Sequence, residues 1–420
     1  MLGNVPTARL KIIEGIAARA GRLAPRKAPV DARDLVRAYY HGVSESDLAT
    51  RTTDNLAGAA LAHLRVAARR RPGESLVEVF NPDAGRDGFA SEHTVIALAT
   101  DDMPFLVDSV GIVFTQGGYK VYLIAHPVLS VTRDARGRLT GHFLDDAPAN
   151  ALAESWQLIE IERLNDPAAI DALRQKLLES LEDVRCATGD WMPMRQRARD
   201  IAAEIESNPP PVPAGEAAEA KALLEWMEDN HFTLLGYREY RLKRGRTHDL
   251  LTPVVATGLG LLRPGRKRAD AAKPVVLAGD IRDFARSKEL LLITKANSIS
   301  TVHRATHLDY VGIKTFNERG QVSGERRFVG LWTSTAYSSS PRDIPLLRQK
   351  VQRVIAHFGL APSSHDGKAV MNALEVYPRN ELFQASVPEL IRIVRGIVNL
   401  YERTEVRLFT RRDEFRRFYS

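Results

Sequence analysis

The sequence predicts an α+β protein: N-terminal helices, a ferredoxin-like sandwich, a second, mixed β-rich domain and a C-terminal helical segment. Apolar residues recur at helical spacing up to residue 73 and then change to alternating, strand-like runs. From 74 to 207 the expected order is β-β-α-β-β-β-α, whose βαββα core is the skeleton of a ferredoxin-like sandwich. Four prolines between 209 and 213 then predict a stiff linker, because proline disrupts helix and sheet interiors.

Composition fits such an architecture. Of the 420 residues, 44% are hydrophobic and 26% are charged, which is typical of a globular protein. The net charge is +7, but the densest arginine stretch, near the C-terminus, is interrupted by acids, so we expect a solvated face and no nucleic-acid partner. The single cysteine, Cys186, excludes an intrachain disulfide and a multi-cysteine zinc site, and it fits a reducing cytoplasm. No apolar run approaches the ~18 residues that would predict a membrane span.

The first segment, residues 1–73, is expected to be helical. Leu10, Ile13 and Ala17 recur at helical spacing, and a later stretch from Leu56 to Val66 does the same. The run Arg69-Arg70-Arg71-Pro72-Gly73 predicts a helix end, because cations suit a helix C-terminus and Pro-Gly cannot continue the helix.

The segment 74–207 is expected to form the sandwich. Asp101-Asp102-Met103-Pro104 predicts a strand-to-helix turn, and Gly117-Gly118 ends that helix. Asp166-Pro167 begins a long helix that runs to about Ser207. The expected strands are 75–80, 93–100, 119–133, 138–143 and 155–163.

The rest of the chain divides into three parts after the linker at 208–220. Residues 221–340 are expected to form the mixed β domain, and 341–404 a helical segment; 405–420 open on a strand at Val406–Thr410. In the β domain, strands are expected at 232–242, 250–256, 259–262, 275–276, 290–294, 306–316 and 321–333, after a helix at 217–229. In the helical segment, helices are expected at 344–358, 367–375 and 387–403.

Familiar catalytic motifs are missing from the sequence. It contains no G-x-x-x-x-G-K-[ST], no G-x-G-x-x-G after a strand, no H-E-x-x-H and no G-x-S-x-G. Nothing therefore predicts a dinucleotide, metal or acyl-transfer site. The pair His365-Asp366 is better explained by a helix start than by catalysis, and Cys186 by packing.

One polar cluster surrounds the predicted strand-to-helix turn. Asp101, Asp102, Asp108 and Ser109 lie where free backbone N–H groups could hold the carboxylate of an effector. The alternative, which we favour, is that Asp101 or Asp102 caps the helix itself.

A second polar cluster lies between two strands of the β domain. It comprises Lys295, Asn297, Ser298, His303 and Arg304. An anion site, an inter-domain polar contact and ordinary loop polarity all fit this composition.

Several blocks of the sequence together resemble one family. They are Ala99–Val110 with its Asp-Asp-Met-Pro-Phe core, Asp229–Tyr240, Thr294–Ser298, His303-Arg304, Asp309–Gly312, Gly324–Leu331, Ser340–Arg348 and His365–Lys368. In this order they resemble the N-terminal region of the large, NAD-specific glutamate dehydrogenases of bacteria. The resemblance covers most of residues 90–420.

The resemblance implies that 74–207 is an ACT-like domain and that 405–420 begin a further, truncated one. It implies a cytoplasmic regulatory or oligomerisation segment, with no catalytic residue, metal or cofactor of its own, because the family's NAD-binding catalytic domain lies downstream. The implied partners are other subunits of the same enzyme, the catalytic domain and an amino-acid effector, with no nucleic acid and no membrane. The complete enzyme would convert L-glutamate, water and NAD to 2-oxoglutarate, ammonium and NADH.

A departure from the ACT pattern concerns the effector. ACT domains often carry a glycine after the Asp-x-x-Pro-like opening, where it lets an amino acid approach the backbone. Phe105 occupies that position here, and its bulk would crowd a ligand. The alternative function, a stand-alone amino-acid-sensing module, depends on this site.

Overall fold

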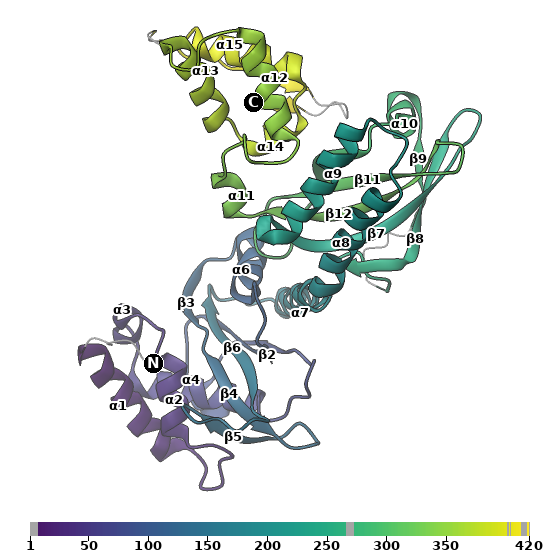
Figure 1. The fold of residues 1–420 in the computed structure, drawn as a ribbon. Coiled ribbons are helices and arrows are strands. Elements are labelled where there is room, and N and C mark those ends of the chain that lie inside the picture. Colours follow the sequence, from purple (N-terminus) through teal and green to yellow (C-terminus); the bar gives the residue numbers. More distant parts are fainter. Residues whose placement is uncertain (1–6, 266–272, 401–402, 404, 413–417, 420) are drawn as a thin grey trace. The chain divides into compact units, whose positions relative to one another are not determined.

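The computed structural model describes residues 7–265, 273–400, 403, 405–412 and 418–419, and it divides into two compact units (Figure 1). The first unit comprises residues up to Arg185 together with Thr301–Ala305. The second comprises Cys186–Ser300 and the chain from Thr306 onward. None of the described helices is both long enough and apolar enough to cross a bilayer.

The first unit begins with helices, most of which are capped by the side chain of the residue just before them. These N-terminal helices are α1 (Thr7–Leu23), α2 (Ala32–Tyr40), α3 (Glu45–Ala49) and α4 (Thr53–Val66). Asp31, Ser44 and Thr52 each accept a backbone hydrogen bond at the start of α2, α3 and α4. These caps satisfy N–H groups that a helix start leaves without an intrahelical partner.

The described residues of the first unit also form a six-stranded antiparallel sheet in the order β1-β2-β6-β4-β5, with β3 paired to β6 beside β4. The strands are β1 (Leu76–Phe80), β2 (Thr94–Asp101), β3 (Val121–Ala125), β4 (Val128–Arg133), β5 (Leu139–Phe143) and β6 (Leu152–Ile161). The short α5 (Ala84–Asp87) precedes β2, α6 (Leu106–Gly117) follows it, and α7 (Pro167–Gly189) follows β6. The α+β class predicted from the sequence is confirmed. The predicted β-β-α-β-β-β-α order is one strand short, because the strand expected at 119–133 is two strands, β3 and β4, and the short α5 lies between β1 and β2.

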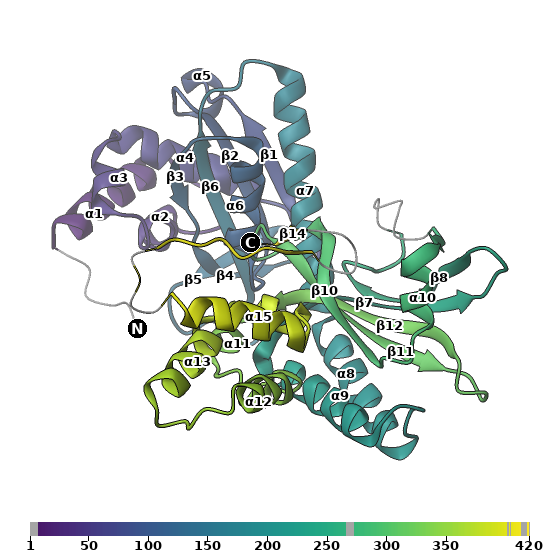
Figure 2. The ribbon, with the colours of Figure 1, turned by 90° about the horizontal axis from the view of Figure 1, so that it is seen from above.

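The two central strands, β2 and β6, are buried on both faces. Val95, Ala97 and Ala99 of β2 pack in one hydrophobic cluster with residues of α1, α2 and α4. Successive side chains of a strand point to opposite faces, so Ile96 and Leu98 face the other side, which α6 and α7 cover (Figure 2). The N-terminal helices and the sheet therefore share a single core.

The second unit is built on another antiparallel sheet, ordered β10-β11-β12-β7-β8-β9 over its described residues. Its strands are β7 (Phe232–Lys243), β8 (Asp249–Gly260), β9 (Val275–Leu277), β10 (Leu291–Ile299), β11 (His307–Phe316) and β12 (Val322–Trp332). Its helices are α8 (Trp191–Ser207), α9 (Ala214–Trp226), the π-helical turn η1 (Met227–His231) and α10 (Gly279–Arg286). The runs expected at 250–256 and 259–262 form one strand, β8.

The C-terminal helical segment shares a hydrophobic cluster with this sheet and with α8 and α9. Its helices are α11 (Ser334–Ser338), α12 (Leu347–Phe358), α13 (His365–Val376), α14 (Arg379–Gln384) and α15 (Val387–Val398). Ser364 caps α13, as expected for a helix start beside His365-Asp366. The sequence analysis missed α5, α10, α11 and α14, which are too short to show a clear helical period.

Two further expectations were wrong. The long helix from Asp166 to Ser207 is two helices, because Asp190 leaves helical geometry and its carboxylate accepts from Gly260 N at 2.7 Å and Arg263 Nη2 at 2.6 Å. The strand expected at Val406–Thr410 does not form: these residues have no strand partner among those described, and Val406 and Leu408 are exposed. Part of the domain expected at 405–420 lies outside the described residues.

Candidate functional site

Asp101, the first residue of the predicted effector cluster, is held in a network of ion pairs. Its Oδ1 accepts from Arg70 Nη2 at 2.8 Å, and its Oδ2 accepts from Arg185 Nη1 at 2.7 Å and from Gly73 N at 2.9 Å. Burial by itself would raise the pKa of Asp101, but the hydrogen bonds from Arg185 and Arg70 outweigh it, so its pKa lies below the ordinary value. Asp101 thus remains ionised and binds the turn after α4 to the sheet.

The same network is anchored by a second carboxylate, Glu154, which is completely buried in β6. It accepts from Arg70 Nη2 at 2.7 Å, from Arg133 Nε at 2.6 Å and from Trp156 Nε1 at 3.0 Å. Burial tends to raise the pKa of Glu154, yet its donors lower it overall. Because every charge in this network has partners, we interpret it as structural.

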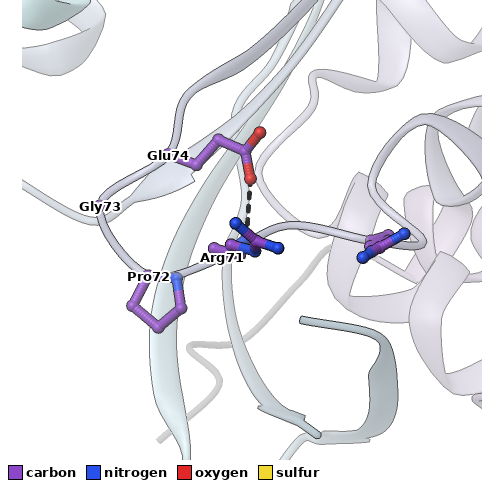
Figure 3. Close-up of a pocket in the computed structure, with 5 residues that line it drawn as sticks. Arg71, Pro72, Gly73 and Glu74 are labelled. Atoms are coloured by element: carbon purple, nitrogen blue, oxygen red, sulfur yellow. Dashed lines mark hydrogen bonds between the residues drawn. The ribbon is translucent and has the colours of Figure 1, made fainter. Parts of the chain in front are cut away.

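A polar pocket lies beside this network (Figure 3). It has a volume of about 590 Å³ and is lined by Arg69, Arg71, Pro72, Gly73 and Glu74. Figure 3 shows the Glu74 carboxylate turned back over the turn, where its Oε2 accepts from Arg71 N at 2.9 Å. The sequence analysis interpreted this run only as a helix stop. The helix ends earlier, at Val66, and Arg70 is fully buried against the two carboxylates.

The start of α6 contradicts the self-capping that we favoured. Phe105 occupies the N-cap position with φ 70°, and no side chain caps the helix. The Oγ of Ser109 donates to the carbonyl of Phe105 at 2.6 Å. A bulky residue rarely adopts this left-handed conformation, which costs on the order of 1 kcal/mol. Phe105 therefore takes the backbone geometry that a glycine would favour at this position.

The structure brings part of the second polar cluster to this turn. The segment Thr301–Ala305, which connects β10 to β11, groups with the first unit. His303 donates from its backbone N to Ser109 Oγ at 3.2 Å, and its Nδ1 lies 3.3 Å from Asp108 Oδ2. The rings of Phe105 and His303 lie 4.7 Å apart, and Thr301 donates to Asp183. His303, Asp108 and Ser109, predicted in separate clusters, thus form one site.

The geometry of this site suits a structural link between the 301–305 segment and the start of α6 better than it suits catalysis. The Ser109 hydroxyl already donates to a backbone carbonyl and accepts from the His303 backbone, so it is not placed as a nucleophile for the imidazole. Asp102, the remaining aspartate of the first polar cluster, donates a hydrogen bond from its backbone N to Ala153 O at 2.9 Å.

The remaining residues of the second cluster lie in the second unit, except Arg304, which belongs to the first. Lys295 Nζ is 2.7 Å from the buried Asp309 carboxylate across the β10–β11 pair. Asn297 and Ser298 lie at the exposed end of β10, and Arg304 lies in the 301–305 segment. Cys186 is buried, in keeping with a packing role. No group of three or more His, Cys, Asp or Glu residues suited to a metal ion occurs within the described ranges.

Comparison with known proteins identifies modules in both units. Residues 35–177 match the family described as glutamate dehydrogenase, ACT1 domain, and residues 344–403 match glutamate dehydrogenase, helical motif 1. The ACT1 match begins in α2, in agreement with the shared core of these helices and the sheet. The helical-motif match covers α12 to α15.

Proteins that are similar over most of this chain are also glutamate dehydrogenases. The chain is 35% identical over 98% of its length to an NAD-specific glutamate dehydrogenase of Halomonas elongata, and 35% identical over 90% to that of Pseudomonas aeruginosa. It is 27% identical over 86% of its length to that of Mycobacterium tuberculosis. The matches cover only 26%, 24% and 21% of these relatives. These matches support an N-terminal region of the NAD-specific glutamate dehydrogenase family, with the ACT1 domain and helical motif 1.

Proposed function

We propose that this chain is a non-catalytic regulatory and assembly segment of a cytoplasmic, NAD-dependent glutamate dehydrogenase. The complete enzyme would oxidise L-glutamate to 2-oxoglutarate and ammonium, with NAD as the hydride acceptor. The observation that carries the proposal is the identity of the two matched modules, an ACT1 domain and a helical motif, in a chain that spans about a quarter of its relatives.

The polar chemistry of the first unit supports this role. Asp101 and Glu154 are occupied by arginines, and Ser109 is occupied by backbone groups. Such saturated groups stabilise a scaffold, whereas catalysis needs a group that can still exchange a proton or attack a substrate.

The edge strand β3 supports assembly with another subunit. Leu123 and Ala125 face the core shared with the N-terminal helices, so the alternate residue Ile124 points to the opposite face, where it is 38% exposed. Val128 of β4 lies on that same face and is 56% exposed. Exposed apolar residues on an edge strand are a typical subunit contact.

Two measurements test the proposal. We expect the isolated chain to produce no NADH from L-glutamate and NAD, and measurable turnover would refute the non-catalytic role. We expect light scattering after gel filtration to show an oligomer that Ile124→Glu weakens. Val376→Glu, at an exposed apolar residue of α13, is the matched control and should leave the mass unchanged. A monomeric wild-type chain would argue against assembly.

A further inference from the structure

A cavity in the first unit lies away from the sites described above. It has a volume of about 670 Å³ and lies among the α3–α4 connection, the segment before β2, and residues of β3 and β6. Its apolar wall includes Leu56, Phe89, Leu123 and Leu158, each at most 3% exposed. Its polar lining includes Asp47, Arg51, Asn55, Glu92, His93 and Glu160.

The most informative group in this cavity is the carboxylate of Glu160, whose side chain is 8% exposed. Its Oε2 accepts from Arg51 Nη2 at 2.6 Å and from Arg51 Nε at 3.1 Å, and His93 Nδ1 lies 3.5 Å from it. Among the described residues, both hydrogen bonds to this carboxylate end on Oε2 and none ends on Oε1. Oε1 is not among the side-chain atoms that are sealed from solvent without a partner, so it is open to the cavity and can accept a hydrogen bond from a ligand.

The charges around the cavity favour a cationic ligand. Three carboxylates line it, those of Asp47, Glu92 and Glu160, against the single guanidinium of Arg51. That guanidinium is already engaged, since it also donates to Asp47 O at 2.8 Å, to Thr50 Oγ1 at 3.0 Å and to Tyr122 O at 3.4 Å. An anion would find no unused guanidinium donor, whereas a cation would add a charge-assisted hydrogen bond to Glu160.

We propose that this cavity binds a compact organic cation, an ammonium group on an apolar body, with an ammonium N–H donating to Oε1 of Glu160. The apolar wall would receive the body of the ligand. Simple amines and α-amino acids share this chemistry. An α-amino acid adds a carboxylate, for which Asn55 offers its side-chain NH2, because the Asn55 Oδ1 already accepts from Ala90 N at 3.2 Å. The inference goes beyond the proposed function, and its test requires no dehydrogenase activity.

The first test is calorimetric titration of the wild-type chain with three probes of matched apolar body: isoamylamine, L-leucine and isocaproate. We expect isoamylamine, L-leucine or both to bind, and isocaproate, which lacks the ammonium group, to bind at least about tenfold more weakly. Tighter binding of L-leucine than of isoamylamine would identify an amino acid as the ligand, and the reverse order a simple amine. Equal or tighter binding of isocaproate, or no binding of any probe, would overturn the proposal.

The second test locates the site. Glu160→Gln should weaken binding of the better probe by about tenfold or more, while Glu78→Gln, at an exposed position of β1 outside the cavity lining, should leave it unchanged. Hydrogen exchange of the wild-type chain should show protection by the probe at residues 47–59 and 89–93. Protection confined to other segments would overturn the assignment, and this measurement decides even where Glu160→Gln fails to fold.

Discussion

Two glutamates on one strand, β6, differ in how their charge is satisfied. Glu154 and Glu160 are six positions apart, an even step, so they lie on the same face of the strand, towards its two ends. Glu154 has donors on both oxygens, from Arg133, Arg70 and Trp156. Glu160 has its donors on one oxygen and a cavity beside it. The comparison teaches that burial alone does not distinguish a structural carboxylate from one that can bind a ligand; the distribution of donors does.

The largest effect on stability is expected at Glu154, where both carboxylate oxygens accept hydrogen bonds. Glu154→Gln should lower the free energy of unfolding of the first unit by about 3 kcal/mol, because Arg70 and Arg133 would then be buried without their counter-charge. Urea denaturation followed by circular dichroism measures this change. Glu78→Gln, at an exposed position of β1, is the matched control and should change stability by less than about 0.5 kcal/mol. Equal effects of the two substitutions would contradict a structural role for Glu154.

Acid should weaken the same network. The pKa values of Glu154 and Asp101 are lowered in the folded protein from ordinary values of 4.5 and 3.8. The folded state therefore binds these protons less readily than the unfolded state, so the stabilisation is fully present above these ordinary values. It is lost as pH falls through the lower, folded-state pKa values. Unfolding free energies measured from neutral to acidic pH should decline more steeply for the wild type than for Glu154→Gln. Parallel curves of unfolding free energy against pH for the two proteins would contradict a stabilising role for the ionised Glu154 carboxylate.

A smaller loss is expected at Asp101. Its side chain is 28% exposed, so water can partly replace the lost partners. Asp101→Asn should lower the free energy of unfolding by about 1 to 2 kcal/mol, since hydrogen bonds to charged groups are worth about 1.5 to 3 kcal/mol each before such compensation. Urea denaturation measures this too. A loss as large as that of Glu154→Gln would show that the exposure of a carboxylate in this network does not determine how much it contributes to stability.

The smallest effect on stability is expected at Glu160, whose donors lie on one oxygen only. Glu160→Gln keeps the shape of the side chain and frees Arg51, whose other donors remain bonded to Asp47 O and Thr50 Oγ1. We expect a loss of about 1 kcal/mol or less in urea denaturation. A loss equal to that of Glu154→Gln would place Glu160 among the structural carboxylates and weaken the case for a ligand.

Much of the fold was predictable because strands and helices impose their own periods on the chain. The alternation in β1 and the apolar runs of β2 and β6 predicted the sheet. The Asp-Asp-Met-Pro turn predicted a helix after β2, but α6 begins at Leu106, three or four residues later than a cap at Asp102 or Asp101 would place it. The family resemblance, carried by several blocks in order, was confirmed by the matched modules and relatives.

The site was less predictable, because it depends on residues that are distant in sequence. Periodicity shows which face of a helix is apolar but not what covers it, so the core that the N-terminal helices share with the sheet was hidden. Arg70 was interpreted as part of a helix end, although it is buried against Glu154. The available signal was chemical: Glu154 and Glu160 are acids within or beside a strongly apolar run, where an ionised group needs a partner.

The return of the chain to the first unit at residues 301–305 determines when that unit can be completed during synthesis. The first unit runs to Arg185, yet the residues that bind Asp108, Ser109 and Asp183 are translated only after most of the second sheet. A nascent chain can bury the apolar core of the first unit early, but the start of α6 acquires its His303 contact late. A fragment that ends at residue 185 would therefore be an incomplete copy of this unit.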